Sequence, residues 1–146
     1  MGKHELSYPR VERDFYPTPS WVIDALAAHV PLEGRRIWEC ACGDGRMAHA
    51  LKAAGASVYS SDVVDRGCCD ELFDFTSEQN PNVTFDAIVT NPPFGPRGKL
   101  AEAFIAAGLR RLRDHGLLAL LLPNDFDSAK TRARFFGECA RLILPS

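Results

Sequence analysis

The sequence predicts an α/β protein with a doubly wound, mostly parallel sheet and helices on both of its faces. Short apolar runs of strand length alternate along the chain with segments of helical periodicity. Runs that are almost wholly apolar are typical of parallel strands covered on both faces. Turns rich in glycine or proline follow two of them, at residues 40–45 and 91–95. Both turns follow the carboxyl ends of strands, which is where ligands bind in an open α/β sheet. The pattern therefore also predicts where a site lies.

The first half of the chain is expected to begin with a flexible segment and a helix. Residues 1–13 are polar, so we expect the folded domain to span residues 14–146. A helix is predicted from Ser20 to about His29. Its core side is assigned to Trp21, Val22, Ala25 and Leu26. Next come a strand at 36–39, a helix at 46–54 that Gly55 ends, and a strand at 56–60.

The second half is expected to complete the sheet. Residues 63–82 hold at most a short strand near Leu72, and a strand at 85–90 follows. A helix from about Lys99 to Arg113 places one apolar face toward the core, made of Ala101, Phe104, Ile105, Gly108 and Leu112. The remaining elements are a strand at 117–122 buried on both sides, a helix at 128–139 and a strand at 141–144.

Composition and charge limit the classes of function. The 146 residues are 46% apolar and 25% charged, which is ordinary for one soluble domain. The net charge of −2 excludes the global basic field that drives generic nucleic-acid binding, so any nucleic-acid contact must be local. No window is long and apolar enough to span a membrane, and the start lacks a signal-peptide core. We therefore expect a cytoplasmic protein with no membrane partner.

The five cysteines lack the regular spacing of a disulfide scaffold. They are Cys40, Cys42, Cys68, Cys69 and Cys139. Four of them could be drawn as metal ligands, but their spacings differ from those of common zinc sites. We expect no metal and interpret them as small, reduced core or loop residues.

The turn Asn91-Pro92-Pro93-Phe94 is the most informative segment. Its two prolines lack backbone donors and have restricted φ angles, so they end the preceding strand and stiffen the turn. The Asn91 amide oxygen and the Pro92 carbonyl can accept N–H bonds from a planar NH2 group, while the Phe94 ring can stack on it. Taken alone, the same segment is also compatible with a simple turn.

A glycine loop follows the strand at 36–39. Glu39, Gly43 and Gly45 stand where a chain must turn sharply and approach a ligand closely. With Ala48 the spacing also satisfies a dinucleotide fingerprint, and Asp62 stands at a suitable distance for a ribose. A pyrophosphate would meet like charge at this loop, whereas the sulfonium and ammonium groups of S-adenosylmethionine would meet carboxylates.

Three other acidic positions extend this interpretation. Asp44 lies inside the loop, Asp62 ends the second strand and can accept both ribose hydroxyls, and Asp74 with the backbone of Phe75 can meet an adenine. Each of these carboxylates could instead be a solvated loop residue.

Assembled in this order, the motifs resemble the class I S-adenosylmethionine-dependent methyltransferases, and within them the DNA adenine-N6 type. The resemblance implies a Rossmann-like fold, an S-adenosylmethionine cofactor and methylation of an NH2 nitrogen, with adenine N6 in DNA favoured. The catalytic residues it implies are Asn91, Pro92, Pro93 and Phe94. The cofactor-binding residues it implies are Tyr16, Thr18, Glu39, Ala41, Gly43, Asp44, Gly45, Asp62, Asp74, Phe75 and Asn91.

Several alternatives stay open. The same turn serves enzymes that methylate RNA adenine or a protein glutamine amide, and a non-catalytic partner subunit could keep the same pocket. A nicotinamide enzyme would leave the double-proline turn unexplained. Arg97 and Lys99 could meet a phosphate, and a solvated helix face is favoured for Lys130, Arg132 and Arg134.

Two features depart from the family. The chain has no insertion of the size that reads a target sequence, and the C-terminal hairpin of the sheet looks incomplete. We therefore expect that a partner chain or a missing tail covers the open edge of the sheet.

Overall fold

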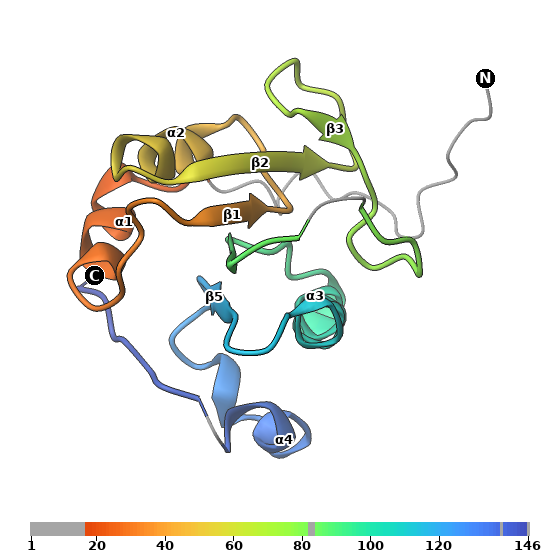
Figure 1. The fold of residues 1–146 in the computed structure, drawn as a ribbon. Helices are drawn as coiled ribbons and strands as arrows, with labels where there is room; N and C mark the ends of the chain where they lie inside the picture. Colours follow the sequence, from red (N-terminus) through yellow and green to blue (C-terminus); the bar gives the residue numbers. More distant parts are fainter. Residues whose placement is uncertain (1–16, 82–83, 138, 146) are drawn as a thin grey trace.

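A five-stranded parallel sheet forms the centre of the computed structural model, which describes residues 17–81, 84–137 and 139–145. The strand order is β3-β2-β1-β4-β5 (Figure 1). The strands are β1 Arg36–Glu39, β2 Ser57–Asp62, β3 Glu71–Leu72, β4 Ala87–Thr90 and β5 Leu117–Leu120. The predicted doubly wound α/β fold is confirmed.

The chain reverses its direction of travel across the sheet at β1. From β1 it moves outward to β2 and β3, then returns to β4 on the other side of β1. Trp38 of β1 is therefore in register with Tyr59 of β2 and with Ile88 of β4. This is the topological switch point, where the loops after β1 and β4 separate and leave room for a ligand.

Helices cover both faces of the sheet (Figure 1). On one face, α1 Ser20–Ala27 and α2 Arg46–Ala53 pack on a core that includes Ile23, Ile37, Leu51 and Val89. On the other face, α3 Lys99–Arg111 packs on an aromatic core built around Trp38, Phe75 and Phe104. Within the described part of the chain, none of the helices is long and apolar enough to cross a membrane.

The predicted apolar face of α3 is confirmed. Ala101, Phe104, Ile105 and Gly108 are buried, and Leu112 packs against the aromatic core from the end of the helix. Gly108 allows close packing, because a Cβ there would lie 2.8 Å from the Leu118 side chain of β5.

The predicted core side of α1 is wrong in one position. Trp21 is 44% exposed, whereas Ile23, which the sequence analysis did not assign to the core, is 2% exposed. Two residues rotate a helix by about 200°, so Trp21 and Ile23 lie on opposite sides. The helix turns Ile23 toward the sheet, with Leu26 and Val30 packed beside it.

The predicted C-terminal elements are also wrong. In place of one helix at 128–139, the chain forms the turns η3 Phe126–Ser128 and η4 Lys130–Arg132 and a short α4 Ala133–Phe136. Residues 141–144 form no strand, and Ile143 is 66% exposed. With no strand beyond it in the described chain, β5 is an edge strand that is half-buried, not buried on both sides.

Arg132 explains why the C-terminal segment leaves the helical path. Its guanidinium donates to the carbonyls of Phe126, at 2.9 Å, and of Arg97, at 2.5 Å. It also lies 3.9 Å from the centre of the buried Phe126 ring. These tertiary contacts hold the backbone in separate turns, against the helical preference of the local sequence.

Candidate functional site

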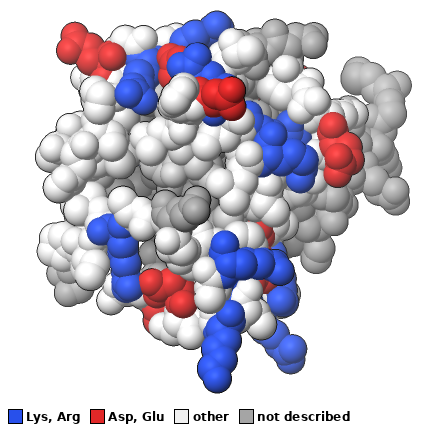
Figure 2. Space-filling model, turned by 60° about the horizontal axis from the view of Figure 1, so that its bottom comes forward, with Lys and Arg blue, Asp and Glu red and all other residues white. Residues whose placement is uncertain are grey.

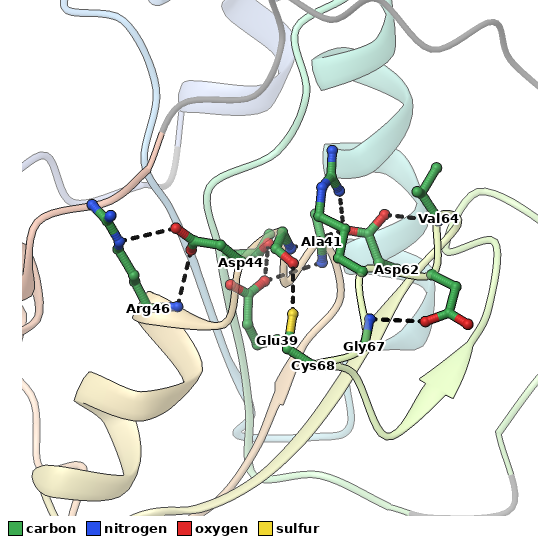
Figure 3. A network of polar contacts seen from close by, with 12 residues as sticks. Glu39, Ala41, Asp44, Arg46, Asp62, Val64, Gly67 and Cys68 are labelled. Atoms are coloured by element: carbon green, nitrogen blue, oxygen red, sulfur yellow. Dashed lines mark hydrogen bonds and ion pairs between the residues drawn. The ribbon is translucent and has the colours of Figure 1, made fainter.

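The candidate site lies at the carboxyl ends of β1, β2 and β4. The glycine loop at residues 40–45 follows β1, and the proline turn at 91–94 follows β4. Because β1 and β4 are paired, the two loops leave the sheet from neighbouring strands. Figure 3 shows the polar contacts that shape the glycine loop.

Glu39 connects these two strands below the loops. Its side chain is 1% exposed, and its Oε1 accepts the Ala41 N–H at 3.0 Å and the Thr90 hydroxyl. Burial raises the pKa of the Glu39 carboxyl to about 7, although both hydrogen bonds act in the opposite direction. Thr90 directly precedes Asn91, so one buried carboxyl holds the bases of both loops.

The glycine loop needs its glycines for their backbone conformation. Gly43 and Gly45 have φ angles of 55° and 86°, a region that residues with a Cβ rarely adopt. Gly43 donates its N–H to Asp62 Oδ2 at 2.9 Å, which ties the loop to the end of β2. Gly45 then begins α2 as its N-cap. The loop therefore directs the Gly43 N–H toward a carboxylate on the neighbouring strand.

Asp62 is the second buried carboxylate of the site. It is 5% exposed, and its Oδ1 accepts the Val64 N–H at 3.2 Å. Arg66 Nη1 lies 3.7 Å from Asp62 Oδ2, a contact that the sequence pattern did not predict. Asp44 instead forms an ion pair with Arg46 on the first turn of α2, with 2.9 Å between Asp44 Oδ2 and Arg46 Nε. Glu39 and Asp62 therefore both accept hydrogen bonds from the glycine loop, whereas Asp44 pairs with Arg46 of α2.

Asn91 contacts the segment before α1. Its Nδ2 donates to the Thr18 hydroxyl at 3.1 Å, although 73 residues separate the two positions. Thr18 is 6% exposed and Pro92 is fully buried. The Asn91 side chain is therefore fixed by a buried partner, and the backbone that follows it is fixed by a buried proline. With its Nδ2 directed at Thr18, the Asn91 amide presents its Oδ1 as the end that accepts hydrogen bonds. Tyr16, predicted from the same segment, lies outside the described residues.

Phe94 packs beside α3 at the end of the turn. Its half-buried ring contacts the cluster of Ala101, Ile105 and Phe126. Its carbonyl accepts the N–H groups of Leu100, at 3.0 Å, and of Ala101. The turn is therefore anchored to the first turn of α3. Pro93, between Pro92 and Phe94, is half-buried.

Asp74 and Phe75 lie on the loop after β3. Asp74 Oδ1 accepts the Thr76 N–H at 2.9 Å and its hydroxyl at 2.7 Å, a turn that shapes the loop from within. The Phe75 ring is buried edge-on against Trp38, 5.0 Å away. The predicted contact of the Phe75 backbone with an adenine stays a prediction.

Arg111 of α3 holds this loop and was missed by the sequence analysis. Its guanidinium donates to the carbonyls of Phe75, at 3.2 Å, and Ser77, at 2.7 Å, and to the Asn80 side chain. It also lies over the rings of Trp38, Phe73 and Phe75, and burial lowers its pKa. In sequence it stands between two other arginine residues and resembles a solvated helix end, so no local signal marks it.

The five cysteines are all free thiols; Cys40 and Cys42 lie within the glycine loop, and Cys68 contacts it. Cys42 is buried in the loop, and burial raises its pKa. Cys68 donates its thiol to the Gly43 carbonyl at 3.0 Å (Figure 3). In the ranges that the structure describes, no three His, Cys, Asp or Glu side chains are grouped so as to hold a metal.

A family model and several solved structures resemble this chain. The model of the methyltransferase small domain matches residues 71–143, half of the chain, from β3 through β5 and α4. The 16S rRNA N2 G1207 methyltransferase of T. thermophilus, solved with AdoMet and guanosine, aligns with a TM-score of 0.57 at 22% identity. That alignment covers 81% of this chain and 36% of the T. thermophilus enzyme, so this chain spans about a third of that enzyme's length.

Two further structures share the fold. A proposed RNA methyltransferase from Pyrococcus horikoshii aligns with a TM-score of 0.58 at 18% identity, over 89% of this chain and 74% of that one. A TehB-like SAM-dependent methyltransferase from Corynebacterium glutamicum has a TM-score of 0.51 at 21% identity, over 80% and 70% of the two chains. Among curated proteins, none matches this sequence significantly.

Proposed function

The chain belongs to the methyltransferase small domain family, and we propose that it methylates an exocyclic NH2 nitrogen of a nucleobase. The observation that carries this proposal is the contact of Asn91 with Thr18 beside a loop lined by carboxylates. That arrangement supports a role for Asn91 as the acceptor for an amine, next to a loop suited to a cationic methyl donor.

S-adenosylmethionine is the cofactor of this activity, in agreement with the family and with the ligand named for the T. thermophilus enzyme. The side chains present fit it: Asp62 supplies negative charge, Glu39 adds to it when ionised, and Gly43 and Gly45 leave a backbone without Cβ atoms. We assign Asp62 to the ribose and the backbone of Phe75 to the adenine. When bound, the sulfonium supplies an already activated methyl group.

The residues of the turn then orient the acceptor. Asn91 Oδ1 and the Pro92 carbonyl each accept one N–H of the NH2 group, which favours a pyramidal nitrogen with its lone pair aimed at the methyl carbon. The nitrogen–carbon bond forms as the carbon–sulfur bond breaks, and the nitrogen afterwards loses one proton. Phe94 provides a flat apolar surface for the base, which must leave any duplex to enter the site.

The resemblance found in the sequence favours adenine N6 in DNA. RNA is a second candidate, because two of the structurally similar proteins are named for RNA, and the T. thermophilus enzyme for guanine N2. Adenine N6 and guanine N2 are both exocyclic amines, so the role of Asn91 is the same in either case. A protein glutamine amide would use the same two acceptors.

The test replaces Asn91 with alanine. We expect Asn91→Ala to lower methyl transfer by about a hundredfold or more, the scale for loss of one directed transition-state hydrogen bond, with the cofactor affinity unchanged. Transfer of a labelled methyl group to DNA, RNA and protein pools is measured beside calorimetric titration with S-adenosylmethionine.

Asn124→Ala is the control, because Asn124 is an exposed asparagine that follows β5. Loss of cofactor binding together with activity in Asn91→Ala would contradict the role assigned to Asn91. Cofactor binding by the wild type without transfer to any pool would favour a non-catalytic subunit.

A further inference from the structure

The charges of this chain divide at the proline turn. Residues 1–94 carry eight Lys and Arg against fourteen Asp and Glu, a net charge of −6. Residues 95–146 carry nine against five, a net charge of +4. The overall charge of −2 therefore hides an acidic part, which holds the glycine loop and Asp62, and a basic part that begins directly after Phe94.

Part of this positive charge gathers on one surface next to the turn. The turn η2 Pro96–Gly98 directly follows the proline turn, and the Arg132 guanidinium of η4 donates to the Arg97 carbonyl. This contact brings η4 and the adjoining α4 to the segment that leaves the site. We call this area, formed by η2, η4 and α4, the C-terminal basic surface.

Some cations of this area are already neutralised. Lys99 pairs with Glu102 at 3.2 Å, Arg132 lies 3.5 Å from the same carboxylate, and Arg141 pairs with Asp127 at 2.7 Å. By contrast, Arg97, Lys130 and Arg134 are exposed, and in the described part of the chain none of these three forms a salt bridge. Figure 2 shows the α4 side, where Lys and Arg side chains project from the lower part of the face around a smaller acidic group.

We infer that the C-terminal basic surface binds the phosphate backbone of a single-stranded nucleic acid through Arg97, Lys130 and Arg134. The inference rests on the proposed function, because that function requires a base outside a duplex at Asn91. Three exposed cations without carboxylate partners can each replace a counterion of the strand. The acidic part of the protein repels the same strand, so the charge division would direct the polymer to the side of the turn away from the cofactor loop.

The experiment measures binding of a fluorescein-labelled 20-nucleotide single strand of mixed sequence, prepared once as RNA and once as DNA. The full chain is compared with Lys130→Glu and with Lys130→Glu combined with Arg134→Glu. Lys52→Glu is the matched control, because Lys52 is an exposed lysine of α2 on the acidic part. Lys130→Glu and Lys52→Glu change the net charge of the protein by the same amount.

We expect the double variant to bind about tenfold or more weakly at low salt. Each lost phosphate contact should also reduce the slope of log affinity against log salt by about 0.7, the value for single strands. Lys52→Glu should leave both quantities near the wild type. Equal weakening by Lys52→Glu and Lys130→Glu would overturn the inference, because it would show only an effect of net charge.

Cofactor titration separates this inference from the proposed function. Binding of S-adenosylmethionine by the wild type without binding of either strand overturns the inference and leaves the methyltransferase proposal for another acceptor. Absence of cofactor binding contradicts the proposed function itself. Preference for RNA or for DNA in the two arms identifies the polymer, and retained cofactor affinity in every variant shows that the fold is intact.

Discussion

The glycine loop and the proline turn leave neighbouring strands toward the same site, but they are held by different forces. Carboxyl acceptors shape the glycine loop: Glu39 accepts the Ala41 N–H, and Asp62 accepts the Gly43 N–H. The proline turn is held by covalent rigidity and by neutral hydrogen bonds. Asn91 donates to Thr18, and the Phe94 carbonyl accepts N–H groups from the first turn of α3. The first loop should therefore respond to pH and to loss of charge, and the second should respond mainly to changes of shape.

This difference between the two loops suits the two ligands of the proposed reaction, the methyl donor and the acceptor amine. Nearby carboxylates increase the affinity for a cationic cofactor, and the glycine loop also uses them as hydrogen-bond acceptors. A neutral NH2 group needs fixed acceptors whose protonation does not change near neutral pH, and an amide and a carbonyl provide them. Variants of Glu39, Asp62 and Thr18 test this contrast, and a variant of Arg111 extends it to the loop after β3; the largest expected effect comes first.

Glu39→Gln should change how stability depends on pH. The folded-state pKa of Glu39, about 7, lies above the ordinary glutamate value of 4.5, so the folded protein binds this proton more tightly than the unfolded chain. Stability should fall as pH rises through this window, by roughly 3 kcal/mol from this group when fully ionised. Urea unfolding at pH 5 and pH 8 measures the effect. Glu39→Gln should lose this part of the pH dependence, and Glu78→Gln, at an exposed site, should retain it. Parallel stability curves for Glu39→Gln and the wild type would refute this account.

Asp62→Asn should weaken cofactor binding by about thirtyfold, or about 2 kcal/mol, because a charged acceptor at the ribose becomes neutral. Asp65→Asn is a close control, since Asp65 accepts the Gly67 N–H at 2.8 Å in a similar turn on the exposed loop. Calorimetric titration of both variants gives the comparison. If Asp62→Asn binds the cofactor as tightly as the wild type does, the charged loop does not serve the cofactor.

Arg111→Met should weaken cofactor binding by about tenfold, because the loop that carries Phe75 loses its anchor to α3. Hydrogen exchange of residues 74–80 should rise in the same variant. Arg111→Lys should not restore binding, since an ammonium cannot reproduce the fork of donors. Arg110→Met is the neighbouring control, because Arg110 makes a single long contact of 3.4 Å to Ser77. Unchanged affinity and exchange in Arg111→Met would remove Arg111 from the site.

Thr18→Val should have the smallest effect, a decrease of about fivefold in kcat, since one neutral hydrogen bond of about 1 kcal/mol orients Asn91. The decrease should be the same at pH 6 and pH 8, in contrast to the Glu39 effect. Thr18→Ser should restore the rate, because it keeps the hydroxyl. A wild-type kcat in Thr18→Val would show that the turn alone holds Asn91 in place.

Local patterns were sufficient for the parts of the fold that local chemistry decides. The strand at 36–39 was predicted with its observed bounds, and β4 and β5 begin or end within two residues of the expected ones. Apolar runs bounded by glycine or proline carry this information in a few adjacent residues. Both loops of the site could be found in the same way, because their chemistry depends on residues next to each other in sequence.

Contacts between distant segments could not be predicted in this way. Arg111 and Arg132 looked like solvated cations, yet each holds backbone carbonyls of another segment through its guanidinium. The contact of Thr18 with Asn91 likewise joins positions 73 residues apart. Nothing in the neighbouring residues distinguishes such an arginine or threonine from an exposed one.

The sequence by itself determined the alternation of strands and helices, the two turns at the switch point and the acidic character of the glycine loop. These features follow from apolar periodicity, from the backbone limits of glycine and proline, and from residue charge. Only the tertiary structure decided that Glu39 is buried between the two loops, that Arg111 and Arg132 act as anchors, and that residues 126–136 form separate short turns. Each of these depends on which distant groups meet after packing, because burial and partner geometry set the energy of a charged side chain.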